Sequence, residues 1–503
     1  MNLRLDRLRA RQNTLWLALL IAIYVIAVAV LAGFRTAPFV GSETDGVYYM
    51  IAARKLFTKE FIPPTFGGGI GMPLAIAAVN KIIPDTFRSA QIVSMLAGLI
   101  YLISVARVLT RLTSTTVGIS TGCLLLVSPI FLLNSTTSLT DVLGACLPLA
   151  AMSVLLSDRQ WPRWSISLIA GLLFGAAYAV RSINLVFVPI LIAGSSVTSN
   201  GVRKNLKALI PAALGLFVGA LPQLYVNQKY FGNAFHSDNW RNIAALVLDW
   251  HYVNRLTSFS EVLVQAGPVL FFLWVKRFLI DIPVALYHVA YLPFLFSIPG
   301  FVVIHRKAMG REKRLLLVWG VCAVVYLLFV APVWRIESRY FLPVLPLVLS
   351  AGVVMWRQLT EKHYGAAMAG LGLAILMSLT VAVRDGRQML RNQSTDFKDA
   401  GLFLRQTAAD NELILASQPS VFLYAQRSGM MFETFSPDDL KRLDETVASN
   451  HVNWIVFDER RGAPDNPELG WLLDKNSAEA AKLGWRTVFE SQKSPKILVW
   501  RVN

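Results

Sequence analysis

Charged residues are scarce in this chain. Of its 503 residues, 16% are charged and 55% are hydrophobic, whereas about a quarter of the residues of an ordinary soluble domain are charged. The mean hydropathy of the chain is +0.51. This composition excludes a soluble globular protein and indicates an integral membrane protein.

Cysteine and histidine are also rare. The three cysteines, Cys123, Cys146 and Cys322, all lie in apolar stretches and have no CxxC spacing. This pattern argues against a disulfide framework and against a zinc site. His236 and His251 lie in one segment without metal-ligand spacing, so a structural role is the simpler interpretation for both.

Acidic residues are fewer than basic ones. The chain has 31 Asp and Glu against 48 Lys and Arg, for a net charge of +17. The basic residues are spread over short segments between apolar stretches, which favours a topology signal and contact with anionic lipids over nucleic-acid binding. We expect membrane lipids as partners and no nucleic acid.

Long apolar stretches dominate the first 384 residues. A bilayer-spanning helix needs about 20 apolar residues, and about eleven such windows can be placed. They cover residues 15–34, 89–106, 115–133, 139–157, 164–180, 183–198, 208–226, 283–304, 315–333, 341–356 and 364–383. We therefore predict a polytopic α-helical membrane protein.

Basic residues assign the loops to sides, because Lys and Arg accumulate on the cytoplasmic side. The alternation is consistent if the N-terminus is inside together with Arg107 and Arg111, Arg159 and Arg163, Arg203 to Lys207, His305 to Arg314, and Arg357 and Lys362. The outer face then receives a long first loop (35–88), residues 134–141, 181–184, 227–282 and 334–340, and the C-terminus.

Beyond residue 384 the composition changes. Residues 412–417, 453–459 and 496–503 have the pattern of strands, while residues 397–408 and 437–449 have helical periodicity, with Ser436 as a cap of the second segment. We predict two domains: residues 1–384 in the membrane, and a small extracytoplasmic α/β domain at 385–503.

Three carboxylates lie in the predicted outer loops. Glu43 and Asp45 follow the first span, where a general base could act on a lipid-borne substrate; a solvated acid at a helix end is the simpler alternative. Asp141 precedes an apolar span, with Thr140 as a possible N-cap. It is either a partner of the helix dipole or a second carboxylate facing Asp45.

Arginines and aromatic residues accompany these acids. Arg54 lies on an expected amphipathic helix at the membrane interface, and Arg181 and Arg339 lie in outer turns. An arginine fork suits phosphate oxygens, although Arg339 could instead pair with Glu337. Further candidates for the substrate pocket are Tyr48, Tyr49, His236 and Tyr340.

The segment "IPPTFGGGIGMPL" (62–74) has no GK[ST] after it and no strand before it. It is therefore not a Walker or dinucleotide motif, and we expect a loop near the entrance of a site.

These motifs resemble, in order, the GT-C superfamily of integral membrane glycosyltransferases, in particular the protein mannosyltransferase and aminoarabinose transferase branch. The resemblance rests on "DGVYY" with "PPTFGGGIGMPL", and on "TSLTDVLGACLPL", "AGLLFGAAYAVRSINLVFVP", "NQKYFGNAFHSDNW" and "ESRYFLPVLPLVL". It covers most of the first 385 residues.

The resemblance implies transfer of a sugar from a polyprenyl-phosphate donor to a glycan, lipid or protein acceptor on the outer face, with inversion. It maps the base onto Asp45 and a second acid onto Asp141. Many members carry an adjacent acidic pair in the first loop, whereas this chain has "ETDG". We expect metal-independent chemistry with no cofactor.

Two other classes remain open. A flippase or transporter of lipid-linked glycans would show broken helices in repeated halves, which the sequence lacks. A non-enzymatic receptor would not need Asp45 and Asp141 to approach each other. The absence of eukaryotic retention signals favours a bacterial inner membrane, with the site facing the periplasm.

Overall fold

The computed structural model describes residues 2–40, 43–64, 69–157, 162–196, 202–248, 253, 256, 258–333, 335–362, 364–492 and 495–502. The chain divides into two compact units. The helical unit contains Met1–Gly33 and Leu56–Arg387, and the second unit contains Phe34–Lys55 and Gln388–Asn503.

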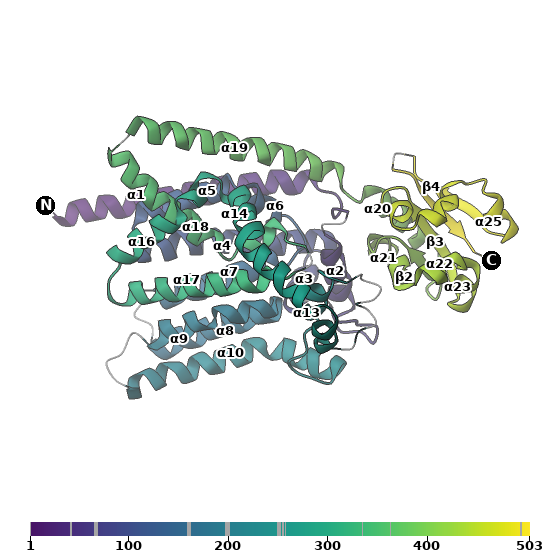
Figure 1. Ribbon diagram of the computed structural model, residues 1–503, viewed down its shortest axis with the longest axis horizontal. Coiled ribbons are helices and arrows are strands. Elements are labelled where there is room, and N and C mark those ends of the chain that lie inside the picture. The colour runs from purple at the N-terminus through teal and green to yellow at the C-terminus, as the bar shows by residue number, and fades with distance from the viewer. Residues whose placement is uncertain are drawn as a thin grey trace. The chain divides into compact units, whose positions relative to one another are not determined.

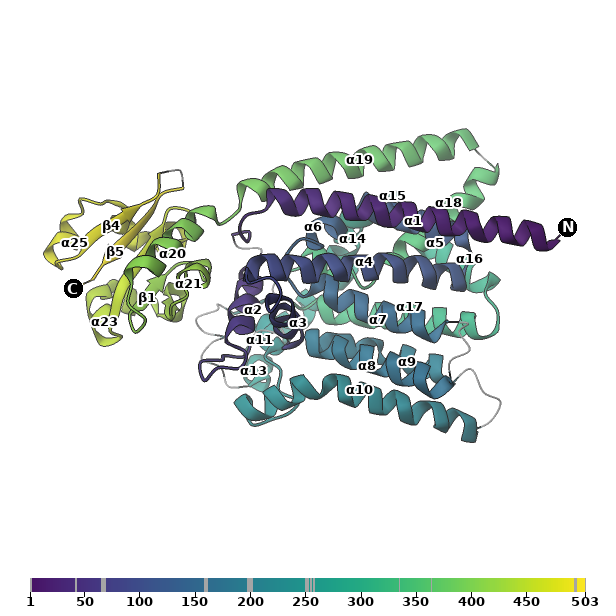
Figure 2. The ribbon, with the colours of Figure 1, turned by 180° about the vertical axis from the view of Figure 1, so that it is seen from behind.

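The first half of the helical unit is built from apolar helices of different lengths (Figure 1). In chain order these are α1 (Asn2–Phe34), α3 (Gly71–Asn80), α4 (Thr86–Leu112), α5 (Thr115–Leu126), α6 (Pro129–Asn134), α7 (Asp141–Leu155), α8 (Arg163–Val180), the 3-10 helix η1 (Ser182–Phe187), α9 (Val188–Ser196) and α10 (Val202–Phe231). Helices α4, α7, α8 and α10 lie side by side, as Figure 2 also shows.

The second half continues with α11 (Asn239–Ala244), α13 (Phe259–Lys276), the π-helical turn η2 (Arg277–Asp281), α14 (Ile282–Ala290), α15 (Leu292–Leu295), α16 (Ser297–Lys307), α17 (Gly310–Val330), the 3-10 turn η3 (Ser338–Phe341), α18 (Leu345–Lys362) and α19 (Tyr364–Arg391), whose last residues belong to the second unit.

Glycines bring α8 and α10 close together. A Cβ at Gly171 or Gly175 of α8 would overlap the carbonyl oxygens of Ala212 or Leu216 on α10. Small residues at a helix interface allow this close backbone packing in membrane proteins. The contact fixes α8, whose C-terminal end carries Arg181.

Five helical segments of the described residues are long and apolar enough to cross a membrane: Thr14–Phe34, Thr86–Leu112, Arg163–Val180, Lys207–Phe231 and Glu312–Val330. Each overlaps a predicted span, which confirms a multi-pass helical protein. The full set of about eleven spans stays a prediction.

The helices between residues 259 and 307 differ from the expected ones. The predicted span 283–304 is divided into α14, α15 and α16, and the apolar helix α13 lies in the segment expected as an outer loop. Pro293 explains the division, because a proline has no N–H to donate and its ring clashes with the carbonyl group four residues before. Tyr291 bridges the break with a φ of 51°.

The C-terminal part of the second unit is an α/β fold around a mixed sheet. Its strands are β1 (Leu413–Ala416), β2 (Gly429–Met431), β3 (Val452–Asp458), β4 (Arg486–Glu490) and β5 (Ile497–Arg501). The sheet order is β2-β1-β3-β5-β4. Strand β1 runs parallel to β2 and β3, and β5 runs antiparallel to β3 and β4.

Short helices surround this sheet: α20 (Thr395–Thr407), α21 (Ser420–Ala425), η4 (Phe432–Thr434), α22 (Pro437–Lys441), α23 (Leu443–Ser449), α24 (Gly462–Asp465), η5 (Pro467–Leu473) and α25 (Ala478–Lys482). The three predicted strands are confirmed as β1, β3 and β5. Ser436 caps α22 as predicted, in a capping box with Asp439.

Candidate active site

The polar turn before Asp141 is buried. Residues 134–141 are all inaccessible to solvent, and the hydroxyl groups of Ser135, Thr136 and Thr137 donate to backbone carbonyls three or four residues before them. These local hydrogen bonds give each of the three buried hydroxyl groups an acceptor, although the segment does not continue as a helix. Thr140 occupies the N-cap position of α7, but its side chain makes no cap hydrogen bond.

Asp141 opens α7 and lies between two guanidinium groups. Its side chain is 4% exposed and pairs through Oδ1 with Nη1 of Arg181. The Nε of Arg339 lies 3.7 Å from the other carboxylate oxygen and 2.8 Å from Oε2 of Glu337. The turn before α7, the end of α8 and the turn η3 therefore meet at one buried carboxylate.

Tyr340 joins this cluster through its ring. The Cζ of Arg181 lies 5.2 Å from the ring centroid and the Cζ of Arg339 lies 5.5 Å from it, which are cation–π distances. Burial raises the pKa of the Tyr340 hydroxyl, although both arginines oppose the shift. The hydroxyl therefore stays protonated at neutral pH and can donate a hydrogen bond.

Two residues that the sequence analysis missed hold Arg181 in place. The buried Asn184 donates to the carbonyl oxygens of Ala177 and Gly144 at 2.9 and 3.2 Å. A Cβ at Gly144 would lie 3.3 Å from Cδ of Arg181, so α7 leaves room for the arginine one turn after Asp141. The polar "RSIN" between apolar stretches is the sequence signal for Asn184.

Part of the glycine-rich segment packs beside Arg181. The N–H of Gly69 donates to the Val180 carbonyl at 3.1 Å, and that of Ile70 donates to Oε1 of Gln223 at 2.7 Å. A Cβ at Gly69 would overlap the Ala179 carbonyl oxygen. The glycine is thus required for close backbone packing; residues 65–68 of this motif lie outside the described residues.

His236 belongs to a separate local cluster. Its ring stacks on Phe231 with centroids 4.1 Å apart, and its Nε2 lies 3.2 Å from Oδ1 of Asp238. Its backbone carbonyl accepts from Nδ2 of Asn227. These contacts are those of a structural residue; His251 lies outside the described residues.

The first-loop candidates belong to the second unit. Asp45 is exposed in the first turn of α2 (Thr44–Lys55), where Tyr48 is exposed and Tyr49 buried. Glu43 is buried, pairs with Arg35 and accepts the Phe39 N–H at 2.7 Å. Its burial and these two contacts favour a structural role for Glu43 over contact with substrate.

Arg54 is bound within the same unit. Its Nη1 donates to the Leu423 carbonyl at 2.7 Å, and burial, together with Arg405, lowers its pKa. The helix α2 forms as predicted and packs on α21. The role of Arg54 in binding donor phosphate stays a prediction.

The residues before α2 are hydrogen-bonded to those before α20. Val40 N donates to Asn392 O at 2.8 Å, and Ser394 N donates to Pro38 O at 2.8 Å. Gln393 accepts from Thr36 N at 2.8 Å and donates to Phe34 O at 3.1 Å. These bonds explain why Phe34–Lys55 groups with the C-terminal residues.

The cluster can bind an anion and orient a polar substrate. It gathers two guanidinium groups, whose forked donors suit an anion, around one buried carboxylate. Among the described residues, no group of three His, Cys, Asp or Glu side chains is arranged to hold a metal ion.

Known proteins share this architecture. Residues 68–225 match the model of the dolichyl-phosphate-mannose-protein mannosyltransferase family. No curated protein sequence matches the chain.

Among solved structures, ArnT from Cupriavidus metallidurans bound to undecaprenyl phosphate is similar with a TM-score of 0.63 and 14% identity, over 97% of this chain and 98% of that one. The archaeal oligosaccharyltransferase AglB from Archaeoglobus fulgidus, in complex with an inhibitory peptide and a dolichol-phosphate, gives a TM-score of 0.54 at 13% identity, over 87% and 69%.

The arabinofuranosyltransferase AftD from Mycobacteria gives a TM-score of 0.58 at 12% identity, over 97% of this chain and 40% of that one. The chain therefore has the fold of these solved membrane glycosyltransferases, which is the fold that its resemblance to the GT-C superfamily predicts.

Proposed function

We propose that the protein transfers a sugar from a polyprenyl-phosphate donor to an acceptor on the periplasmic face of a bacterial inner membrane. The observation that carries this proposal is the buried cluster of Asp141, Arg181 and Arg339 in a chain with a GT-C fold. Solved neighbours with undecaprenyl phosphate or a dolichol-phosphate bound support a lipid-phosphate ligand.

The reaction is a single displacement with inversion. Asp45 accepts the proton of the acceptor hydroxyl or amine as its oxygen or nitrogen forms a bond to the anomeric carbon. The bond between that carbon and the phosphate oxygen breaks, and the polyprenyl phosphate leaves with the electron pair. Asp45 is exposed at the start of α2, which suits a group that must meet an acceptor.

Arg181 and Arg339 hold the leaving phosphate. Charge accumulates on the phosphate oxygens as the bond breaks, and fixed guanidinium donors stabilise this charge in the transition state. Asp141 sets the direction of both arginines and orients sugar or acceptor hydroxyls. A phosphate is a good leaving group, so positioning and cationic donors replace a strong general acid.

The acceptor side follows from the predicted topology. The charge distribution predicts that the turns carrying Asp141, Arg181 and Arg339 lie opposite the basic loops, which supports a reaction outside the cytoplasm. We propose that Asp45 and Asp141 both act in the transfer, and that no metal is required.

The test is transfer of radiolabelled sugar from polyprenyl-phosphate donors in membranes that contain the wild type, Asp45→Asn or Asp141→Asn at equal protein level. Both variants should lose at least a hundredfold in rate, within the usual range for a general base, and chelator should change nothing. Asp238→Asn, which changes an acid of the His236 cluster, is the matched control and should transfer at the wild-type rate.

Full activity of Asp45→Asn would contradict the mechanism. Absence of transfer from every polyprenyl-phosphate donor by the wild type would contradict the function, above all if the protein instead moved labelled lipid across vesicle membranes.

A further inference from the structure

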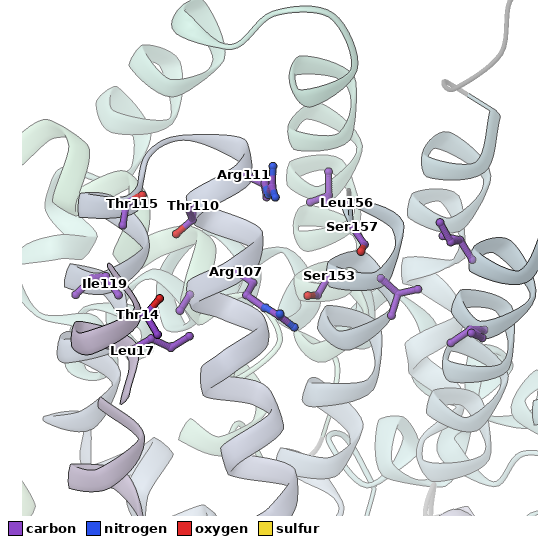
Figure 3. A pocket seen from close by; sticks show the side chains of 14 residues that line it. Thr14, Leu17, Arg107, Thr110, Arg111, Thr115, Ile119, Ser153, Leu156 and Ser157 are labelled. Atoms are coloured by element: carbon purple, nitrogen blue, oxygen red, sulfur yellow. The ribbon is translucent and has the colours of Figure 1, made fainter. Parts of the chain in front are cut away.

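A cavity with polar and apolar walls lies at the end of the helical unit away from Asp141. It has a volume of about 980 Å³ and is lined by α1, α4, α5, α7 and α8 (Figure 3). Asp141 is the first residue of α7 and Ser153 is near its last, so twelve residues, or about 18 Å of helix axis, separate the two sites. The cavity is therefore distinct from the candidate active site.

Two arginines of α4 supply the charge of this cavity. Arg107 and Arg111 lie one turn apart, and the Arg107 side chain extends toward Ser153 of α7 in Figure 3. No acidic side chain is among the described residues that line the cavity.

Hydroxyl groups and apolar side chains complete the lining. Thr110, Thr115, Ser153 and Ser157 offer hydroxyl donors near the arginines, and such donors suit phosphate oxygens. Leu17, Ile119, Ile166 and Ile169 form apolar walls, which an inorganic ion would leave uncovered. The lining thus fits an anionic head with an apolar chain.

The predicted topology places this end at the cytoplasmic leaflet, because Arg107, Arg111 and Arg163 belong to the basic loops. Anionic lipids of that leaflet attract basic residues. A volume of about 980 Å³ is at the upper end of the range for a drug-sized ligand, and is therefore larger than a bare phosphate requires.

We propose that this cavity binds a phosphate-bearing lipid of the cytoplasmic leaflet. The phosphate contacts Arg107 and Arg111 with the hydroxyls of Thr110 and Ser153, and a hydrocarbon chain lies along the apolar walls. Both an anionic glycerophospholipid and a polyprenyl phosphate have this chemistry.

The experiment measures lipid retained by the purified full-length protein with native mass spectrometry. The protein is equilibrated with phosphatidylcholine vesicles that contain either phosphatidylglycerol or polyprenyl phosphate. The polyprenyl-phosphate arm uses the Arg339→Gln background, so that lipid held at the candidate active site is not counted. The assay measures bound lipid and not sugar transfer. Its result can therefore contradict this proposal without contradicting the proposed function.

We expect the wild type to retain a phosphate lipid in preference to phosphatidylcholine. The double variant Arg107→Gln, Arg111→Gln should bind it about thirtyfold more weakly, since each basic residue at a lipid surface contributes about a fivefold factor. Arg306→Gln removes one exposed charge from the same predicted face outside the cavity, and should retain lipid like the wild type.

Retention of one lipid in only one arm would identify the source of the phosphate. Equal retention by the wild type and the double variant, or no preference over phosphatidylcholine, would overturn the proposal. If the double variant does not fold, Ser153→Phe fills the cavity while keeping both charges, and it must also reduce retention.

Discussion

The buried carboxylate of Asp141 and the guanidinium group of Arg339 depend on each other. Asp141 is 4% and Arg339 9% exposed, and Glu337 lies on the other side of the arginine. Removing one partner of a buried ion pair costs about 3–5 kcal/mol when no other partner compensates; Arg181 still pairs with Asp141, so the loss here should be smaller. Mutation of this arginine should therefore affect both folding stability and transfer.

We predict that Arg339→Gln lowers the rate of sugar transfer at least a hundredfold, which corresponds to about 2.7 kcal/mol of lost transition-state stabilisation. It should also lower the midpoint of thermal unfolding of the purified protein. Arg335→Gln changes an exposed arginine four residues earlier in the same turn and should leave both quantities near wild type. Equal effects of the two variants would refute a specific role for Arg339.

Asp396 gives the second unit a pH dependence of its own. Its side chain is 8% exposed, Arg460 lies 3.7 Å away, and burial raises its pKa above 3.8 although Arg460 opposes the shift. The folded state therefore holds the proton more tightly than the unfolded chain does. The free energy of unfolding then falls as pH rises from about the unfolded pKa through the folded one.

We predict that Asp396→Asn removes this loss of stability. Hydrogen–deuterium exchange of α20, measured from pH 4 to pH 8 and corrected for intrinsic rates, should show less loss of protection with rising pH in the variant. Asp410→Asn, at a side chain that is 96% exposed, should behave as wild type. An unchanged pH dependence in Asp396→Asn would exclude this residue as the cause.

At the scale of elements, residues 34–40 owe their position to the residues before α20. The Gln393 side chain makes three of the hydrogen bonds that hold them, to Thr36 and Phe34, and a net hydrogen bond is worth about 1 kcal/mol. Asp45 lies five residues after this segment. Gln393 is therefore a positioning residue for the proposed base.

We predict that Gln393→Ala increases amide exchange of residues 36–40 by at least about tenfold, since it removes two or three hydrogen bonds. It should lower kcat more than it raises KM for the donor, because the base is misplaced while donor binding persists. Gln406→Ala, at an exposed position of α20, is the control. A change in KM alone would contradict positioning of the base.

Elements with a clear local sequence pattern were the ones that could be predicted. Strands β1, β3 and β5 are apolar runs of the right length, and the capping box at Ser436 is a local motif. The short strands β2 and β4 have weaker patterns, and β4 is only partly buried. The break of α14 at Pro293 was readable from the sequence, whereas the left-handed conformation of Tyr291 depends on packing.

At the scale of the whole molecule, the candidate site depends on contacts that cross long stretches of chain. Asp141, Arg181 and Arg339 were each recognisable as polar residues at the ends of apolar spans. Their mutual pairing was not, because it joins residues up to about 200 positions apart and no periodic pattern encodes such contacts. Asn184 and Gly144 could not be predicted from the sequence, because their roles become visible when α7 and the end of α8 are seen in contact.

The proposed mechanism gives Asp45 and Asp141 complementary roles in one reaction. Residues that act as a unit have strongly non-additive effects on rate. We predict that the Asp45→Asn, Asp141→Asn double variant loses little more transfer activity than the more damaged single variant. If instead the losses of the two single variants, expressed as activation free energies, add within about 0.5 kcal/mol, the two acids act independently and the proposed mechanism is wrong. Steady-state rates of all four proteins with one polyprenyl-phosphate donor decide between these outcomes.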